Sequence, residues 1–271
     1  MNFTKSRALI LALCITALCS LLLAVPLLAP PTPDRQTAIA KAINFLENTD
    51  EPYGLLFLDV IYRRFGVEEF ADSLSRYDQL LAEQQTQWSI FNVFRRISVY
   101  DNPMQASVLD DVLAPTDIII SRALYCDRYG LPHDYFALLD DTANKGEYYL
   151  THVLLACIWI QENGFESSLP NGFVDKVCRA TAVLVNRNPL IVDDLTLEAA
   201  AFLYIAGQGE RVSPSFVNRV LASQNADGGW EQDPDRKEAS YWHSTISALL
   251  LLLHIEYPAD SYHPTIATAT P

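Results

Sequence analysis

The sequence predicts an all-α protein in which an apolar N-terminal segment precedes one domain of about six helical hairpins. Three observations support this fold class. After Asp34, apolar residues recur at steps of three and four, clear strand alternation is absent, and Gly or Pro interrupts the pattern at fairly even distances. Counting the runs between these interruptions gives about twelve helices of roughly 10–18 residues, joined by short loops.

The N-terminal segment has the pattern of a membrane anchor. Residues 1–7 carry Lys5 and Arg7, and residues 8–29 contain no charged side chain. As a helix, the uncharged stretch would rise about 33 Å, enough to cross the hydrocarbon core of a bilayer. The two basic residues would hold the N-terminus in the cytoplasm and place the main domain on the other side. A cleaved signal peptide is the alternative, although Pro30 is a poor residue directly after a cleavage site.

The rest of the chain divides by composition. Residues 30–36 contain Pro30, Pro31 and Pro33. This proline content predicts a short, stiff spacer. Residues 37–258 carry the helical pattern and are expected to form the domain. Residues 259–271 are predicted to be a disordered tail.

The charge of the domain argues against nucleic acid as a partner. Lys5 and Arg7 precede Asp34, the first acidic residue, so the remaining chain has 17 basic and 33 acidic residues and a net charge of −16. Such a surface repels phosphate backbones and anionic lipid headgroups. Attachment to a membrane is therefore left to residues 8–29.

Three cysteines lie in the predicted domain, and all three fall within apolar helical patterns. They are Cys126, Cys157 and Cys178, and no pair of them has the CxxC spacing. Buried free thiols are one interpretation, and one disulfide with a thiol left over is the other.

A repeat in the second half of the chain predicts the site. Three strongly apolar helices share one arrangement, in which an acidic residue at the start is followed five positions later by a second polar residue. More amphipathic helices, over residues 172–185 and 214–223, lie between them. This alternation implies inner helices covered by outer ones, and twelve such helices could close into an α/α toroid with the inner helix starts around one mouth. The pairs are Glu147 with His152, Asp193 with Glu198, and Glu238 with His243, at steps of 46 and 45 residues.

His152, Glu198 and His243 are therefore the candidate functional cluster. Two imidazoles and a carboxylate are a suitable ligand set for a divalent metal with one open position. They would equally make an acid/base cluster without a metal. The alternative is structural, because polar residues at helix starts often cap the helix or bond a neighbouring loop. Aromatic residues flank the same helix starts and could line an apolar cavity; they are Tyr148, Tyr149, Tyr241 and Trp242. Of these, Tyr149, Tyr241 and Trp242 are the candidate ligand-binding residues.

One short motif resembles a known family. In Leu221 to Trp230, the pattern Gln-x-x-x-Gly-x-Trp occurs as Gln224, Gly228 and Trp230. It resembles the QW repeat of the squalene and terpene cyclases, and similar Asp-Gly-Gly-Trp turns occur in protein prenyltransferase β subunits. The resemblance implies an α/α toroid, with the motif in a structural role that ties outer helices together. Over residues 140–257 the likeness lies in periodicity more than in identity.

The catalytic motifs of these families are not intact in the chain. The cyclases protonate an alkene with an Asp-x-Asp-Asp motif, and its first Asp corresponds here to Leu138, before Asp140 and Asp141. The prenyltransferases bind zinc through Asp, Cys and His, and the position of the Cys is Leu195 here. We therefore expect a membrane-anchored, extracytoplasmic binding or scaffolding module for an apolar small molecule or a protein partner. The alternative is an enzyme that uses the mouth residues in cyclase-like or hydrolytic chemistry.

Overall fold

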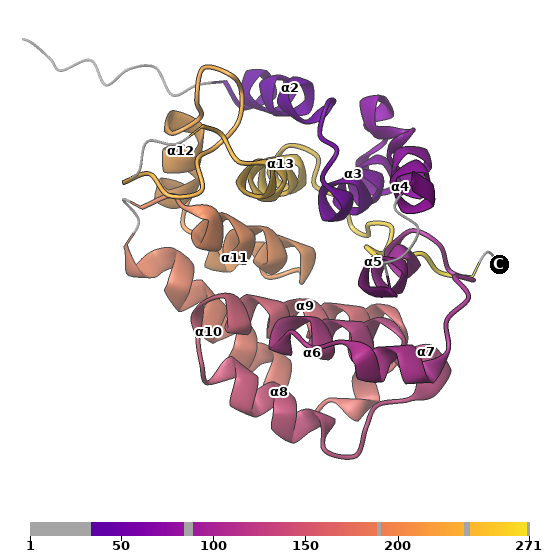
Figure 1. Cartoon of the computed structure of the whole chain (residues 1–271). Coiled ribbons are helices and arrows are strands. Elements are labelled where there is room, and N and C mark those ends of the chain that lie inside the picture. The colour runs from indigo at the N-terminus through magenta and orange to yellow at the C-terminus, as the bar shows by residue number, and fades with distance from the viewer. Residues whose placement is uncertain (1–33, 84–88, 189–190, 236–238, 270–271) are drawn as a thin grey trace, which may run out of the picture. The chain divides into compact units, whose positions relative to one another are not determined.

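The computed structural model describes residues 34–83, 89–188, 191–235 and 239–269, and it confirms the all-α class (Figure 1). The described residues form no strand, and their β-structure is a single antiparallel bridge between Trp230 and Tyr241. The α-helices are α2 (Arg35–Leu46), α3 (Pro52–Phe65), α4 (Ser73–Glu83), α5 (Ser89–Phe94), α6 (Pro115–Leu124), α7 (Cys126–Tyr129), α8 (Tyr135–Ala143), α9 (Glu147–Glu162), α10 (Phe173–Arg187), α11 (Asp194–Ile205), α12 (Pro214–Ala222) and α13 (Trp242–Glu256). Five 3₁₀ helices lie between them: η1 (Glu68–Phe70), η2 (Arg95–Ile97), η3 (Ala106–Asp111), η4 (Glu166–Ser168) and η5 (Gly209–Arg211).

The predicted alternation of inner and outer helices is present in the second half of the chain. In α11, nine of twelve residues are buried, and in α13 eleven of fifteen, compared with five of fifteen in α10. A helix that is apolar on all sides needs neighbours on all sides, whereas an amphipathic helix covers a core with one face. α11 and α13 are therefore interior helices, and α10 packs on the outside of α9 and α11.

Contacts between the inner helices run in one continuous order. α13 lies between α11 on one side and α2 and α3 on the other, and α9 lies between α11 and α6 (Figure 1). α6 in turn contacts α5, and α5 contacts α3. The outer positions are taken by α2 against α13, α4 against α3, and α8 against α6 and α9. This order brings the starts of α9, α11 and α13, which are far apart in sequence, to one region.

The N-terminal boundary differs from the prediction. The spacer was expected to extend to residue 36, but α2 begins at Arg35. Asp34 caps this helix, because its carboxylate accepts a hydrogen bond from the backbone N–H of Thr37 at 3.2 Å. Residues 1–7, 8–29 and 30–33 lie outside the described residues. Within the described ranges, no helix combines the length and apolar character that a membrane crossing requires.

The prediction of a disordered tail over residues 259–271 was wrong for the part that the structure describes, residues 259–269. Thr265 and Ile266 are buried. The Thr265 hydroxyl accepts a hydrogen bond from the indole of Trp159 at 3.0 Å and donates one to Glu162 at 2.6 Å. Backbone polar groups of this C-terminal segment also bond to α9 and η2. The polar groups of this segment, which suggested disorder, form hydrogen bonds with Trp159, Glu162 and Arg96 of the domain.

The cysteines follow the first of the two interpretations. Cys126, Cys157 and Cys178 are free and buried. Burial raises the pKa of Cys157 to about 12 and that of Cys126 to about 11. Both thiols are therefore protonated core groups at neutral pH.

Candidate functional site

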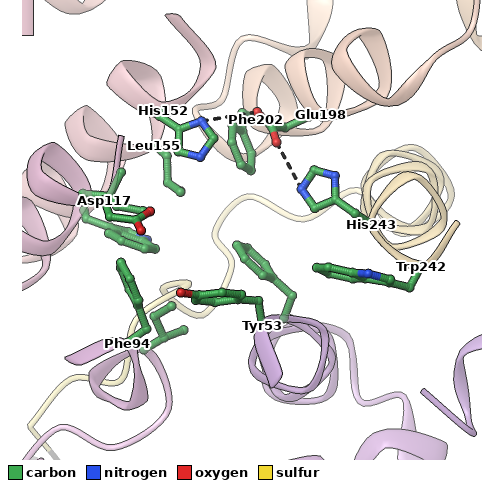
Figure 2. Close-up of a pocket in the computed structure, with 13 residues that line it drawn as sticks. Tyr53, Phe94, Asp117, His152, Leu155, Glu198, Phe202, Trp242 and His243 are labelled. Carbon is green, nitrogen blue, oxygen red and sulfur yellow. Dashed lines mark ion pairs between the residues drawn. The ribbon is translucent and has the colours of Figure 1, made fainter. Parts of the chain in front are cut away.

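The inner helices enclose a cavity of about 210 Å³ that opens beside the starts of α9, α11 and α13 (Figure 2). Its walls are mostly aromatic and aliphatic, and four carboxyl or imidazole side chains, one each from α6, α9, α11 and α13, line it. A cavity of this size is larger than the roughly 150 Å³ engineered cavity that takes up benzene in another protein. The lining residues are Tyr53, Phe57, Phe94, Ile97, Asp117, Ile120, His152, Leu155, Trp159, Glu198, Phe202, Trp242 and His243.

His243 is held between two carboxylates. Its Nδ1 lies 2.8 Å from Oδ1 of Asp194, and its Nε2 lies 3.1 Å from Oε2 of Glu198. Burial by itself would lower the pKa of His243, but the hydrogen bonds and negative charges of the two carboxylates outweigh it and raise the pKa to about 10. The ring is therefore an imidazolium at neutral pH, with both N–H groups engaged. We call these three residues the His243 clamp.

Asp194 is the centre of the hydrogen bonds that support the clamp. Besides His243, it accepts hydrogen bonds from the hydroxyls of Tyr148 at 2.8 Å and Ser244 at 2.7 Å. Burial would raise the pKa of Asp194, but these donors and the charge of His243 lower it below the usual value. The three inner helices α9, α11 and α13 are thus joined at their starts by one buried carboxylate.

Glu198 has one oxygen in the clamp and one outside it. No protein group donates a hydrogen bond to Oε1, although the residue is only 1% exposed. The nearest ion-pair contact of Oε1 is Nδ1 of His152, at 3.8 Å, which is too long for a hydrogen bond. Because buried carboxylate oxygens usually have a donor, this atom stands out among the cavity residues.

His152 is oriented by its own helix. Its Nδ1 lies 2.8 Å from the backbone carbonyl oxygen of Tyr148, so this nitrogen is the donor. In the neutral ring, Nε2 is then an acceptor. The side chain is 23% exposed and lines the cavity.

The structure thus brings together His152, Glu198 and His243, the three members of the predicted cluster. Their partners at the helix starts differ from the predicted pairs. Asp193 is the N-cap of α11 and forms a capping box with Thr196, while its neighbour Asp194 faces the clamp. Glu238 lies outside the described residues.

Asp117 was not predicted, although it lines the same cavity. It lies in the first turn of α6, after Pro115 at the start of that helix. Burial raises the pKa of Asp117, and the nearby charge of His152 partly offsets this. Its position in a helix start is the one feature it shares with the predicted cluster, but α6 lies outside the 46- and 45-residue repeat.

The three predicted aromatic residues have different positions. Trp242 lines the cavity. The ring of Tyr241 lies 5.6 Å from that of Trp242, centroid to centroid, and Tyr241 lines a separate surface depression. Tyr149 does not line the cavity and is 37% exposed, with Lys145 over its ring. Consecutive residues of a helix point about 100° apart, so Tyr148 faces the clamp and Tyr149 faces away.

The Gln-x-x-x-Gly-x-Trp motif makes local structural contacts. Gln224 donates hydrogen bonds to the backbone oxygens of Ala38, in α2, and of Gly228. The buried indole of Trp230 donates to the carbonyl oxygen of Val220 in α12 at 2.8 Å. The motif therefore joins the turn to α2 and α12 and does not face the cavity.

The acidic pair that follows Leu138 is also away from the cavity. Asp140 lies on the outer helix α8, where it pairs with Lys176 at the surface. This environment lowers the pKa of Asp140, chiefly through its hydrogen bond with Lys176. A carboxylate that stays ionised cannot act as the protonating acid of the cyclases.

Metal binding finds no support in the arrangement of the cluster. Within the described ranges, no group of three or more His, Cys, Asp or Glu residues has an arrangement that could hold a metal ion. An imidazole must be neutral to bind a metal, whereas both ring nitrogens of His243 donate hydrogen bonds to carboxylates. The metal set of His152, Glu198 and His243 stays a hypothesis, and the geometry favours the alternative without a metal.

Comparison of the chain with models of known protein families, with curated proteins and with solved structures gives no match.

Proposed function

We propose that this chain is a binding module that holds a small, largely apolar molecule in the cavity between its inner helices. The observation that carries the proposal is the cavity itself, about 210 Å³ in volume, with walls that are mainly aromatic and few polar groups (Figure 2). Preformed apolar cavities with a small number of placed polar side chains are the usual form of small-molecule sites. The aromatic residues of the wall are Tyr53, Phe57, Phe94, Trp159, Phe202 and Trp242.

The proposed scaffold for this site is a compact α/α toroid. The order of contacts from α3 through α13, α11, α9, α6 and α5 back to α3 supports a closed ring, and the Gln224–Gly228–Trp230 motif resembles that of toroid families. Residues 8–29 would anchor the module in a membrane, with the domain outside the cytoplasm. Binding in this setting would serve capture or presentation of the ligand.

A matched pair of substitutions tests the binding proposal. Leu155→Phe narrows the cavity, and Leu113→Phe makes the same change at a surface position that is 86% exposed. The probe is 1-fluoro-4-propylbenzene, whose ¹⁹F resonance broadens and shifts on binding. We expect saturable binding to the native chain and to Leu113→Phe, and at least tenfold weaker binding to Leu155→Phe. Equal affinity of the two variants for the probe would reject the cavity as the site of binding.

A second candidate is an enzyme that uses the same cavity for acid/base chemistry. The observation that favours it is the pairing of groups with different tasks: Nε2 of His152 is an acceptor in the neutral ring, and the half-buried Asp117 has a raised pKa. Chemical change of a bound compound, followed by mass spectrometry, distinguishes the two candidates. Conversion by the native chain that is lost in His152→Gln supports the enzyme, whereas unchanged compounds that bind support the module.

A further inference from the structure

Oε1 of Glu198 indicates which kind of ligand group the cavity would bind. The atom is buried and accepts no hydrogen bond from the protein, and the residue that carries it lines the cavity. Its sister oxygen, Oε2, is already bound to His243 at 3.1 Å. Nδ1 of His152 does not serve Oε1, because its proton goes to the carbonyl oxygen of Tyr148. The free position around Oε1 therefore calls for a donor from within the cavity.

The charges around the cavity favour a cation there. The lining contains no Lys or Arg among the described residues. In the His243 clamp, two carboxylates face one imidazolium, which leaves one negative charge around the cavity when His152 is neutral. Asp117 adds a second when it is ionised. Since charges interact more strongly in a buried site than in water, an anionic ligand is disfavoured and a cationic one is favoured.

The aromatic walls suit the same ligand. Trp242 and Tyr53 face the cavity from one side, and Phe202 lies on the opposite side with His152 and Glu198 next to it (Figure 2). Ring faces attract cations through their quadrupoles, with Trp the strongest. They also bury the apolar part of a ligand. A neutral hydrocarbon would use the walls but leave Oε1 without a donor.

We propose that the ligand of this cavity is a small protonated amine with an aromatic or branched apolar group, whose N–H donates to Oε1 of Glu198 while its apolar part lies against the aromatic walls. This inference rests on the proposed binding function and adds the chemical class of the ligand. The requirement for an N–H follows from the acceptor, since an ammonium without hydrogens would gain the cation–π attraction alone.

Two compounds of nearly the same shape test it. 2-(4-Fluorophenyl)ethylamine is protonated at pH 7, and 1-fluoro-4-propylbenzene replaces its ammonium group by a methyl group. Binding of each to the full-length chain is measured by ¹⁹F NMR titration. A hydrogen bond to a charged group in a buried site predicts that the amine binds about 10- to 100-fold more tightly. In Glu198→Gln this preference is expected to fall below about threefold.

Glu162→Gln is the matched control. Glu162 is a half-buried glutamate that bonds to Thr265 and does not line the cavity, so the amine preference should persist in this variant. If Glu198→Gln does not fold, the affinities of the native chain for the amine and the propyl compound still test whether the cavity prefers the amine. Asp117→Asn, which removes negative charge without touching the clamp, is then expected to weaken binding of the amine alone.

The outcomes separate the two proposals. Equal affinity of the native chain for both compounds overturns the amine inference and leaves the binding module in place. An amine preference that survives in a folded Glu198→Gln also overturns it, because recognition then lies elsewhere. If neither compound binds saturably, the proposed function and this inference fall together.

Discussion

Replacing His243 by Gln should destabilise the protein by several kcal/mol, by an amount that depends on pH. The change removes the cation between Asp194 and Glu198 and leaves two buried carboxylates without it. The pKa of His243 rises from 6.5 to about 10 in the folded state. At about 1.4 kcal/mol for each tenfold change in proton affinity, this corresponds to about 5 kcal/mol. The ring is 26% exposed, so we take about 3–5 kcal/mol, the range found when one partner of a buried ion pair is removed.

The sign of the pH dependence follows from the direction of this shift. A group whose pKa is higher in the folded than in the unfolded state contributes its full stability below the unfolded value, here 6.5, and loses it as pH rises through the folded value. The difference in unfolding free energy between native and His243→Gln should therefore be largest at pH 6 and fall to below about 1 kcal/mol near pH 10.

Urea unfolding followed by circular dichroism at pH 6, 8 and 10 measures the difference. Asp194→Asn/His243→Gln is the control, because it removes one of the stranded carboxylates with the cation. It should recover part of the loss, since an uncompensated buried charge is the larger component. A difference between native and His243→Gln that stays constant from pH 6 to pH 10 would refute the imidazolium assignment.

Three further results are expected in unfolding experiments. Gly228→Ala should cost about 3 kcal/mol, because Gly228 has φ +96° and a new Cβ would lie 2.4 Å from a backbone oxygen; Gly66→Ala, with φ +68° and open space around it, should cost about 1 kcal/mol. Thr265→Val should cost about 1–3 kcal/mol by removing the hydroxyl that joins the C-terminal segment to α9, while Thr268→Val, at an exposed position, stays within about 0.5 kcal/mol of native. Burial lowers the pKa of His254 from 6.5 to about 4, so the unfolded chain binds more protons than the folded chain between these pH values. The unfolding free energy of the native chain should therefore fall by up to about 3 kcal/mol relative to that of His254→Leu as pH falls from 6.5 to 4. No change in that difference would mean that the ring is charged in the folded state.

The sequence was sufficient for the fold class and for much of the cavity rim. Helical spacing and regular breakers predict helices because both depend on local chemistry. His152, Glu198 and His243 could be found because each is a polar residue in an otherwise apolar helix, where burial demands a reason. Their roles were less accessible, since the sequence does not show that His243 has a carboxylate at each nitrogen.

Other parts of the site depend on packing that a single sequence does not reveal. A one-residue difference in helix phase turns a side chain by about 100°, and this separates Asp194 from Asp193 and Tyr148 from Tyr149. Asp117 was missed because its helix lies outside the repeat, so nothing local connects it to the other three groups. The burial of Thr265 depends on partners about a hundred residues earlier in the chain.

The position of α13 between α11 and α2 has a consequence for how the protein reaches this state. Arg35 and Glu256, which are 221 residues apart, form an ion pair where α2 meets α13. Helical proteins usually fold fast because their contacts are local, but here the interior helix α13 gains its neighbours α2 and α3 only when distant parts of the chain meet. We therefore expect slower folding than in a simple helical bundle of this size, and a period during synthesis when the apolar faces of α2, α3 and α11 that α13 later covers need protection from aggregation.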